Sequence, residues 1–269
     1  MESHLLGWIA ALCYLTAEIL AVIALRRPRP LVATLGMAAL AAGLALHFGD
    51  LQVRAHFLHS VPYRNLEGSV SLFGWMLGIA YLALQIRHRE RAIGPFLLPI
   101  VIVSTVIGLL VPAQPATPSP GTRGVLFALH VTFAILAYAA FTFSFVLSIL
   151  YLIQNRQLRR RQTGVLFSRL PALEVIGRMN RTSVSIGLAV LALALVIGMV
   201  RARELWGTLA DPKILWALIT LVVYALLLWM DRRGWEGRRV AILSILGFGV
   251  VLFSYTVVNL YFSTEHHFR

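Results

Sequence analysis

The sequence predicts an all-α membrane protein that crosses the bilayer about eight times. Of its 269 residues, 59% are hydrophobic and only 13% are charged, whereas soluble domains carry about 25% charged residues. The apolar residues form continuous runs, and a helix that spans the ~30 Å hydrocarbon core needs about 20 of them. The basic residues fall between these runs. Composition and patterning therefore both indicate an integral membrane protein.

Eight stretches are long and apolar enough to be transmembrane helices. The fifth is longer than a bilayer requires, so we expect it to tilt or to project into the cytoplasm. We expect a single transmembrane domain over residues 1–269, in which the first run is a retained span and not a cleaved signal peptide. The predicted spans are residues 5–25, 31–49, 68–86, 94–112, 124–154, 182–200, 212–230 and 239–262.

The distribution of Lys and Arg predicts the orientation of these spans. The connections after the first, third, fifth and seventh spans hold 17 of the 24 basic residues. Because cytoplasmic loops are enriched in Lys and Arg, we expect this side to be cytoplasmic and both termini to lie outside. The formal charge of +13 is then an orientation signal and not a nucleic-acid-binding surface. These features predict a multi-pass membrane protein.

Three connecting segments are long enough to have a structure of their own. Residues 50–67, which contain HFLHSVPYRN, are predicted to form an outer loop. Residues 112–123 contain four prolines and are predicted to form a second, non-helical outer loop. Residues 163–180 carry apolar and charged side chains in an amphipathic pattern, which predicts a helix lying on the cytoplasmic surface.

Seven of the eight histidines fall in the predicted outer half of the protein. Imidazole ligates transition metals and haem iron and seldom lies in lipid without a partner. The cluster therefore indicates one metal or haem site, although several of these residues fit an ordinary solvated surface equally well. His130 differs because it stands in the first two turns of an apolar helix, where its partner is either iron or a backbone carbonyl. The seven are His4, His47, His56, His59, His130, His266 and His267.

No catalytic motif accompanies these histidines, so we do not expect an enzyme. The sequence lacks HExxH, GxSxG, Walker A and EF-hand patterns. Its single cysteine, Cys13, excludes a disulfide framework, a thiolate zinc site and a CxxCH haem-attachment motif. Glu18 is the one ionisable residue deep within a span, where a carboxyl group is either part of an ion pathway or structural.

Several segments resemble one family of membrane proteins. His130 with the following VTFAILAYAAF opens the fifth span, and WGTLADPKILWALITLVVYALLLW covers residues 206–229. LPALEVIGRMN, GWEGRR and FSYTVVNLYFSTEHHF cover residues 170–180, 234–239 and 253–268. These segments resemble the cytochrome c assembly family, which includes CcsA and the HemX-like proteins. The chain is most similar to the short YpjD-like inner-membrane members, and the resemblance is strongest from residue 121 to residue 267.

The resemblance implies a haem site at the outer face. In the family, two outer histidines flank a tryptophan-rich loop and are axial ligands of haem displayed for delivery to apocytochrome c. The matching residues here are His130 and His266, and the cofactor is expected to be haem b. The matching loop runs from Trp206 to Asp211, and both of these residues are expected to contribute to the cofactor site. His47 and His267 are the reserve ligands.

Two departures from the family pattern favour the HemX-like and YpjD-like branch over a cytochrome synthase. The family loop reads WGxxWxWDP, whereas WGTLADP here is two residues shorter and lacks both central tryptophans. Trp229 stands where cytochrome-assembly members carry a histidine within the span. This substitution argues against a second, intramembrane haem site.

The leading hypothesis is therefore a haem-handling protein of cytochrome c biogenesis. Its expected partners are membrane lipid, haem and other membrane or cytochrome-biogenesis proteins, and not nucleic acid. One alternative is a transporter, or a regulatory subunit of a membrane complex, that keeps the fold without haem and uses Glu18 and the outer histidines. Another is a structural partner that docks through its Arg-rich segment 156–181.

Overall fold

The computed structural model is all-helical over the residues that it describes, which confirms the predicted fold class. This part of the chain contains nine α-helices, the short 3-10 helix η2 (Arg91–Ile93) and no strand. The described residues are 4–57, 66–88, 91–111, 124–161, 164–206 and 212–261.

A long helix forms at each of the eight predicted spans. Within the described residues, six helices are long and apolar enough to cross a membrane, and the apolar helix α4 has 17 residues. The chain is thus a multi-pass membrane protein, and eight crossings stay a prediction. The eight long helices are α1 (Leu5–Arg26), α2 (Pro30–Phe57), α3 (Leu66–His88), α4 (Gly94–Leu110), α5 (Val125–Arg159), α7 (Leu173–Trp206), α8 (Pro212–Arg232) and α9 (Gly237–Tyr261).

The predicted outer loop over residues 50–67 is wrong in its first half. Residues 50–57 continue α2 as a helix. Leu51 is buried, and Asp50 forms an ion pair with Arg54 one turn further on. The charged residues Asp50 and Arg54 end the apolar run, so the sequence predicts that the helix ends there. They are four residues apart, however, and an ion pair with this spacing stabilises a helix. The proline-rich segment 112–123 lies outside the described residues.

The amphipathic segment 163–180 is not one surface helix in the structure. It comprises the short helix α6 (Val165–Arg169) and the first turns of α7, with Pro171 between them. Proline lacks the backbone N–H and disfavours helical geometry in the residue before it, which explains the break.

The chain divides into two compact units, each with its own buried core. Unit 1 comprises Met1–Ala116 and Gln157–Ala172, and therefore contains α1 to α4 and α6. Unit 2 comprises Thr117–Arg156 and Leu173–Arg269, and contains most of α5 together with α7, α8 and α9.

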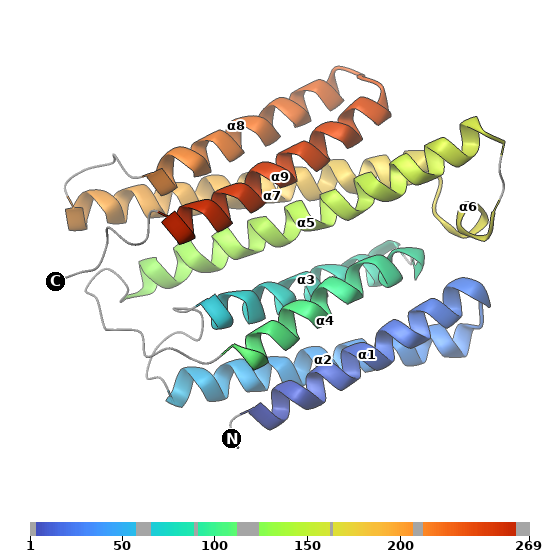
Figure 1. Cartoon of the computed structure of the whole chain (residues 1–269), viewed down its shortest axis with the longest axis horizontal. Coiled ribbons are helices and arrows are strands. Elements are labelled where there is room, and N and C mark those ends of the chain that lie inside the picture. Colours follow the sequence, from blue (N-terminus) through green and yellow to red (C-terminus); the bar gives the residue numbers. More distant parts are fainter. Residues whose placement is uncertain are drawn as a thin grey trace. The chain divides into compact units, whose positions relative to one another are not determined.

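The helices of unit 1 pack closely through small residues. α1 runs side by side with α2, α3 with α4, and α1 also packs along α4 (Figure 1). A Cβ atom at Gly43 would come within 2.8 Å of the Tyr14 ring, and one at Gly74 within 2.9 Å of Ser104 Cβ. Helices in lipid gain little from the hydrophobic effect between them, so close packing of this kind is what associates them.

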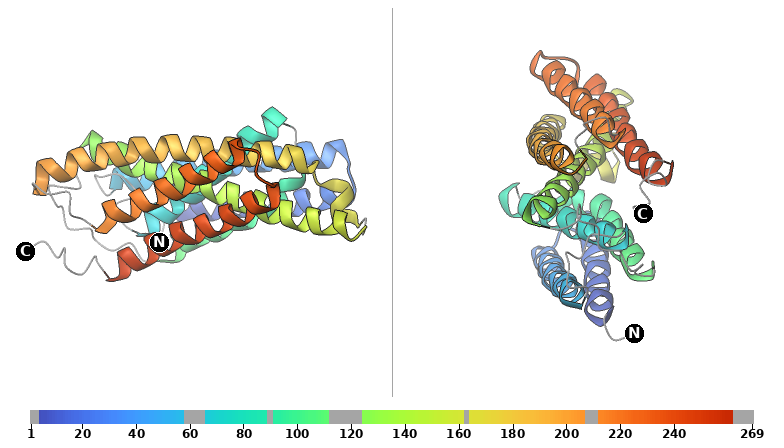
Figure 2. Two further views of the ribbon diagram at one scale, coloured as in Figure 1. Left: turned by 90° about the horizontal axis from the view of Figure 1, so that it is seen from above. Right: turned by 90° about the vertical axis from the view of Figure 1, so that its left-hand side faces the viewer.

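An aromatic core holds the helices of unit 2 together. Phe141 of α5 stacks on Tyr224 of α8 with ring centroids 3.7 Å apart, and Phe145 stacks on Phe248 of α9 at 4.5 Å. A Cβ at Gly187 of α7 would lie 2.6 Å from the Phe141 ring, so this glycine lets α7 approach. The views in Figure 2 agree with the contacts in placing α8 beside α9.

A buried polar cluster joins three helices of unit 2. The Ser144 hydroxyl of α5 donates to Asn180 Oδ1 of α7 at 2.6 Å, and the Asn180 amide donates to Ser244 Oγ of α9 at 3.3 Å. All three residues are at most 6% exposed. Polar side chains at such depth hydrogen-bond across helices because lipid offers no partner. The cluster therefore fixes the register of these three helices.

Replacing Asn180 by Ala should destabilise unit 2, because both serine hydroxyls lose their amide partner. An interhelical hydrogen bond in a membrane contributes about 0.6–2 kcal/mol, so two of them predict a loss of roughly 1–3 kcal/mol. SDS-induced unfolding of the purified protein measures this loss. Thr182→Ala is the matched control, because its hydroxyl is exposed and bonds only to Arg178 O of its own helix. Equal effects of the two substitutions would contradict the role assigned to the cluster.

Candidate functional site

The imidazole of His130 lies between α5 and α7 in unit 2. His130 stands in the second turn of α5, and its Nδ1 is 2.7 Å from the carbonyl oxygen of Ala194 on α7. A carbonyl only accepts, so Nδ1 carries the proton and donates it. In the neutral ring the unprotonated nitrogen is then Nε2. No residue that the structure describes donates a hydrogen bond to Nε2, so its lone pair is available to a metal.

Gly198 provides the space in which this imidazole sits. A Cβ at Gly198 would lie 2.6 Å from His130 Cε1 and 2.8 Å from Nδ1. In an α-helix the carbonyl of residue 194 accepts the N–H of residue 198. A missing side chain at that position uncovers the carbonyl for a second donor. Ala194 and Gly198 together form a seat for the protonated edge of the ring.

The described helices that precede or follow the remaining predicted haem residues begin or end at one end of unit 2, the end that carries His130. His130 near the start of α5 contacts the last third of α7, and Trp216 near the start of α8 packs on Phe253 in the last third of α9, at 4.9 Å between ring centroids. The starts of α5 and α8 therefore lie at the same end as the ends of α7 and α9. Trp206 is the last residue of α7.

Three predicted site residues fall outside the described part of the chain. These are Asp211, His266 and His267, and the side chain of Trp206 is outside it as well. Asp211 directly precedes the first residue of α8, and His266 follows the last residue of α9 by five positions. Among the described residues, no three His, Cys, Asp or Glu side chains group as a metal site.

The reserve ligand His47 lies in unit 1 and is fully buried. Its Nδ1 is 3.2 Å from the Tyr14 hydroxyl, and its Nε2 is 2.8 Å from Ser71 Oγ. Both ring nitrogens are thus engaged in hydrogen bonds within the helix bundle. In this conformation His47 is a satisfied core histidine.

Sequence analysis missed a buried charged cluster next to His47. Arg54 is 9% exposed, and its guanidinium group contacts Asp50 at 2.8 Å, the Gly108 carbonyl at 3.0 Å and His4 Nδ1 at 3.2 Å. Burial, followed by the charge of Arg54, lowers the pKa of His4, so a neutral imidazole accepts this hydrogen bond. The spacing of Asp50 and Arg54, four residues apart at the end of an apolar run, was the signal in the sequence.

Glu18 and Trp229, which the sequence also singled out, lie in different units and differ in burial. Glu18 is half-buried in unit 1, and its Oε2 has no hydrogen-bond partner among the described residues. Trp229 is 52% exposed on α8, and the guanidinium of Arg233 lies over its ring at 5.1 Å from the centroid. Trp229 thus faces out of unit 2.

Comparison with known proteins places this chain among membrane proteins of cytochrome assembly. The family of the cytochrome C assembly protein matches residues 63–266. The cytochrome c biogenesis protein CcsA of Prochlorococcus marinus (strain MIT 9215) is 30% identical over 233 residues, which are 77% of this chain and 74% of that protein. The CcsA proteins of Synechococcus sp. (strain JA-2-3B'a(2-13)) and Mesostigma viride are 30% and 28% identical, over 74% and 78% of each chain respectively.

The family match includes α3 to α9 and therefore the whole seat of His130 on α7. The match covers more than half of the chain, and the relatives align along most of their own length. This chain belongs to the cytochrome c assembly protein family.

Proposed function

We propose that the protein holds haem b at its outer face through His130 and His266 and acts in cytochrome c biogenesis. Membership of the cytochrome c assembly family supports the biological role. The observation that carries the haem site is the hydrogen bond from His130 Nδ1 to the Ala194 carbonyl at 2.7 Å. That bond leaves Nε2 as the ligating nitrogen.

The donor set fits an iron porphyrin. Metal-binding histidines commonly donate their other ring N–H to a carbonyl, which fixes the tautomer and raises the basicity of the ligand. His130 has this arrangement with the Ala194 carbonyl. Haem, when bound, supplies the iron whose potential the two axial ligands set. The role of this chain is to hold the ring nitrogen in place and to present the cofactor to an acceptor.

The second ligand is assigned to the segment after α9. This helix ends at the same end of unit 2 as the start of α5, and His266 follows its last residue, Tyr261, by five positions. Five residues of chain reach up to about 17 Å when extended. That length would allow His266 to reach a haem held by His130. His267 stays the reserve ligand.

The short loop between α7 and α8 is assigned to the haem edge. Trp206 offers an apolar ring for the macrocycle, and its indole N–H, like the guanidinium groups of Arg201 and Arg203, suits a propionate. Asp211 is the acidic residue of this loop, and we assign it to the same site. We place the protein in a bacterial inner membrane, with this end of unit 2 on the outer side.

The first test is the visible absorption spectrum of the protein purified from haem-replete cells. Wild-type protein should show a Soret band and sharp α and β bands, which are typical of six-coordinate haem with two imidazole ligands. His130→Ala and His266→Ala should each lose these bands, because the iron would lose one of its two imidazole ligands and the protein would retain less haem. Separate His47→Ala and His267→Ala variants should keep them.

Glu18→Gln serves as the control that separates this proposal from ion transport. The substitution removes a buried carboxyl group in unit 1 and should leave the haem content unchanged. Wild-type protein that is colourless and takes up no added haemin would overturn the haem proposal. Loss of a measured ion flux in Glu18→Gln, with no haem in either protein, would support a transporter instead.

Gly198→Ala tests the seat of His130 without changing a ligand. The added methyl group would overlap the imidazole edge and force the ring away from the Ala194 carbonyl. Disruption of such a supporting hydrogen bond lowers metal affinity by about 10- to 100-fold. Haemin titration measures the affinity, and the midpoint potential of the bound haem should shift with it.

The matched control is Gly249→Ala in α9 of the same unit, where nothing lies within 4 Å of the added Cβ. This variant should bind haemin as the wild type does. If Gly198→Ala keeps both the affinity and the potential of the wild type, the hydrogen bond to Ala194 does not position the ligand.

A further inference from the structure

The connection between α8 and α9 carries a dense group of arginines. We call residues 229–239 the α8–α9 turn. α8 begins at the end of unit 2 that carries His130 and rises about 30 Å over its 21 residues, so this turn lies at the opposite end of the unit. That end is predicted to be cytoplasmic. Its four exposed arginines are Arg232, Arg233, Arg238 and Arg239.

Two of these arginines lie over tryptophan rings. The guanidinium of Arg233 is 5.1 Å from the ring centroid of Trp229, and that of Arg239 is 5.7 Å from the ring centroid of Trp235. The two rings are 52% and 41% exposed. A guanidinium that stacks on a ring uses its flat face and keeps the N–H groups at its edge for an anion. Tryptophan is enriched where a membrane meets water, which is the level of the lipid headgroups.

Backbone hydrogen bonds fix the shape of the turn. Gly234 has a φ of +78°, and its N–H donates to the Asp231 carbonyl at 3.1 Å. The next N–H, that of Trp235, donates to the Met230 carbonyl at 3.3 Å. This pair of bonds around a left-handed glycine is the Schellman motif that ends a helix. The arginines are therefore presented by an ordered turn, which lowers the entropy that binding costs.

The acidic residues of the turn do not balance its arginines. Asp231 pairs with Arg181 of α7, and Glu236 lies 3.9 Å from Arg239 in an exposed ion pair, which contributes little. Arg238 and Arg239 also stand in the first turn of α9, which contains no acidic residue. The helix dipole is positive at that end, so cations there repel it. An external anion would relieve this repulsion.

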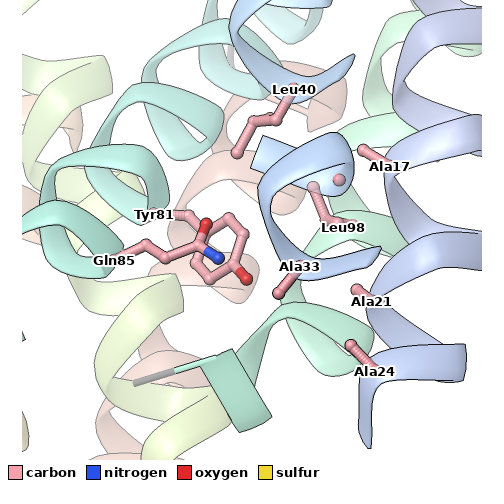
Figure 3. Close-up of a pocket in the computed structure, with 9 residues that line it drawn as sticks. Ala17, Ala21, Ala24, Ala33, Leu40, Tyr81, Gln85 and Leu98 are labelled. Carbon is pink, nitrogen blue, oxygen red and sulfur yellow. The ribbon is translucent and has the colours of Figure 1, made fainter. Parts of the chain in front are cut away.

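The arginine-rich turn of unit 1 lacks such a platform. Arg26, Arg27 and Arg29 are exposed between α1 and α2, but no Phe, Trp or Tyr occurs between Tyr14 and Phe48. Several alanines beside this turn line a small hollow instead, as Figure 3 shows. The hollow holds about 20 Å³ of space, which is room for a water molecule. The two turns thus share their charge but not the aromatic rings.

We infer that the α8–α9 turn is a surface that binds anionic phospholipid headgroups. The guanidinium edges of Arg233 and Arg239 donate to phosphate oxygens, and the rings of Trp229 and Trp235 hold both groups at headgroup depth. Charge identifies the lipid class, because anionic lipids of the cytoplasmic leaflet attract basic residues. A zwitterionic headgroup carries an ammonium group as well, which the arginines repel.

This surface is separate from the proposed haem site. The two lie at opposite ends of unit 2, and they share no residue. Substitutions in the α8–α9 turn should leave the haem spectrum unchanged. Failure of the lipid proposal is therefore distinguishable from failure of the haem proposal.

The test titrates the full-length protein in detergent with phosphatidylglycerol or phosphatidylcholine. Native mass spectrometry gives the Kd of the tightest-bound lipid. Wild-type protein should bind phosphatidylglycerol more tightly than phosphatidylcholine, and high salt should reduce the difference because it screens the arginines. Replacing Arg233 and Arg239 together by Gln should weaken phosphatidylglycerol binding about 30-fold, or about fivefold for each arginine.

The tryptophans and the other turn supply the comparison variants. Trp229→Leu with Trp235→Leu keeps every charge and should still weaken phosphatidylglycerol binding about tenfold, because the guanidinium groups lose their platform. Arg27→Gln with Arg29→Gln is the matched control, since it removes the same charge from the turn without tryptophans and should leave the tightest Kd unchanged. All of these side chains are exposed, so the variants should fold, and size-exclusion elution checks this.

Three results would each overturn the proposal. The first is equal affinity of the wild type for the two lipids, and the second is an equal loss of phosphatidylglycerol affinity in the two arginine variants. The third is an unchanged affinity in the tryptophan variant.

Discussion

A polar side chain between these helices can find a hydrogen-bond partner only inside the protein, because the bilayer core supplies none. The helices satisfy their own backbone, so the constraint falls on the polar side chains. In unit 2 it is met by Ser144, Asn180 and Ser244, which bond one another across three helices. The contact of His130 with the Ala194 carbonyl obeys the same constraint, and it also determines which nitrogen is left for a ligand. One ring nitrogen of His130 is thus hydrogen-bonded within the protein, and the other has no partner among the described residues.

The comparison of His130 with His47 shows why one histidine suits a cofactor and the other does not. Both are partly or fully buried near polar partners, yet His47 engages both nitrogens, with Tyr14 and Ser71. His130 engages one, and the absence of a side chain at Gly198 lets it reach a helix carbonyl that normally serves only the backbone. The difference between the two histidines thus depends on one backbone acceptor, the carbonyl oxygen of Ala194 on α7.

Hydropathy predicted the helices well because length and apolar content decide which segments cross a bilayer. It placed the end of α2 too early, since the apolar run stops at Asp50, whereas tertiary contacts bury Asp50 with Arg54 and prolong the helix. For the site, the position of His130 in an apolar helix predicted a partner but not its identity. Ala194 is 64 residues away in the sequence, and no local pattern indicates that its carbonyl faces His130. The partners of His47, which are 33 and 24 residues distant, were hidden for the same reason.

The residues that match the family do not coincide with the boundaries of the two units. The match begins at residue 63, so α1 and α2 precede it, although both pack into unit 1 with α3 and α4. These two helices supply most of the polar cluster around His47. The polar features of unit 1 thus depend on helices outside the matched region, whereas the seat of His130 lies wholly within it. Both helices that form this seat, α5 with His130 and α7 with Ala194 and Gly198, lie within the residues that match the family.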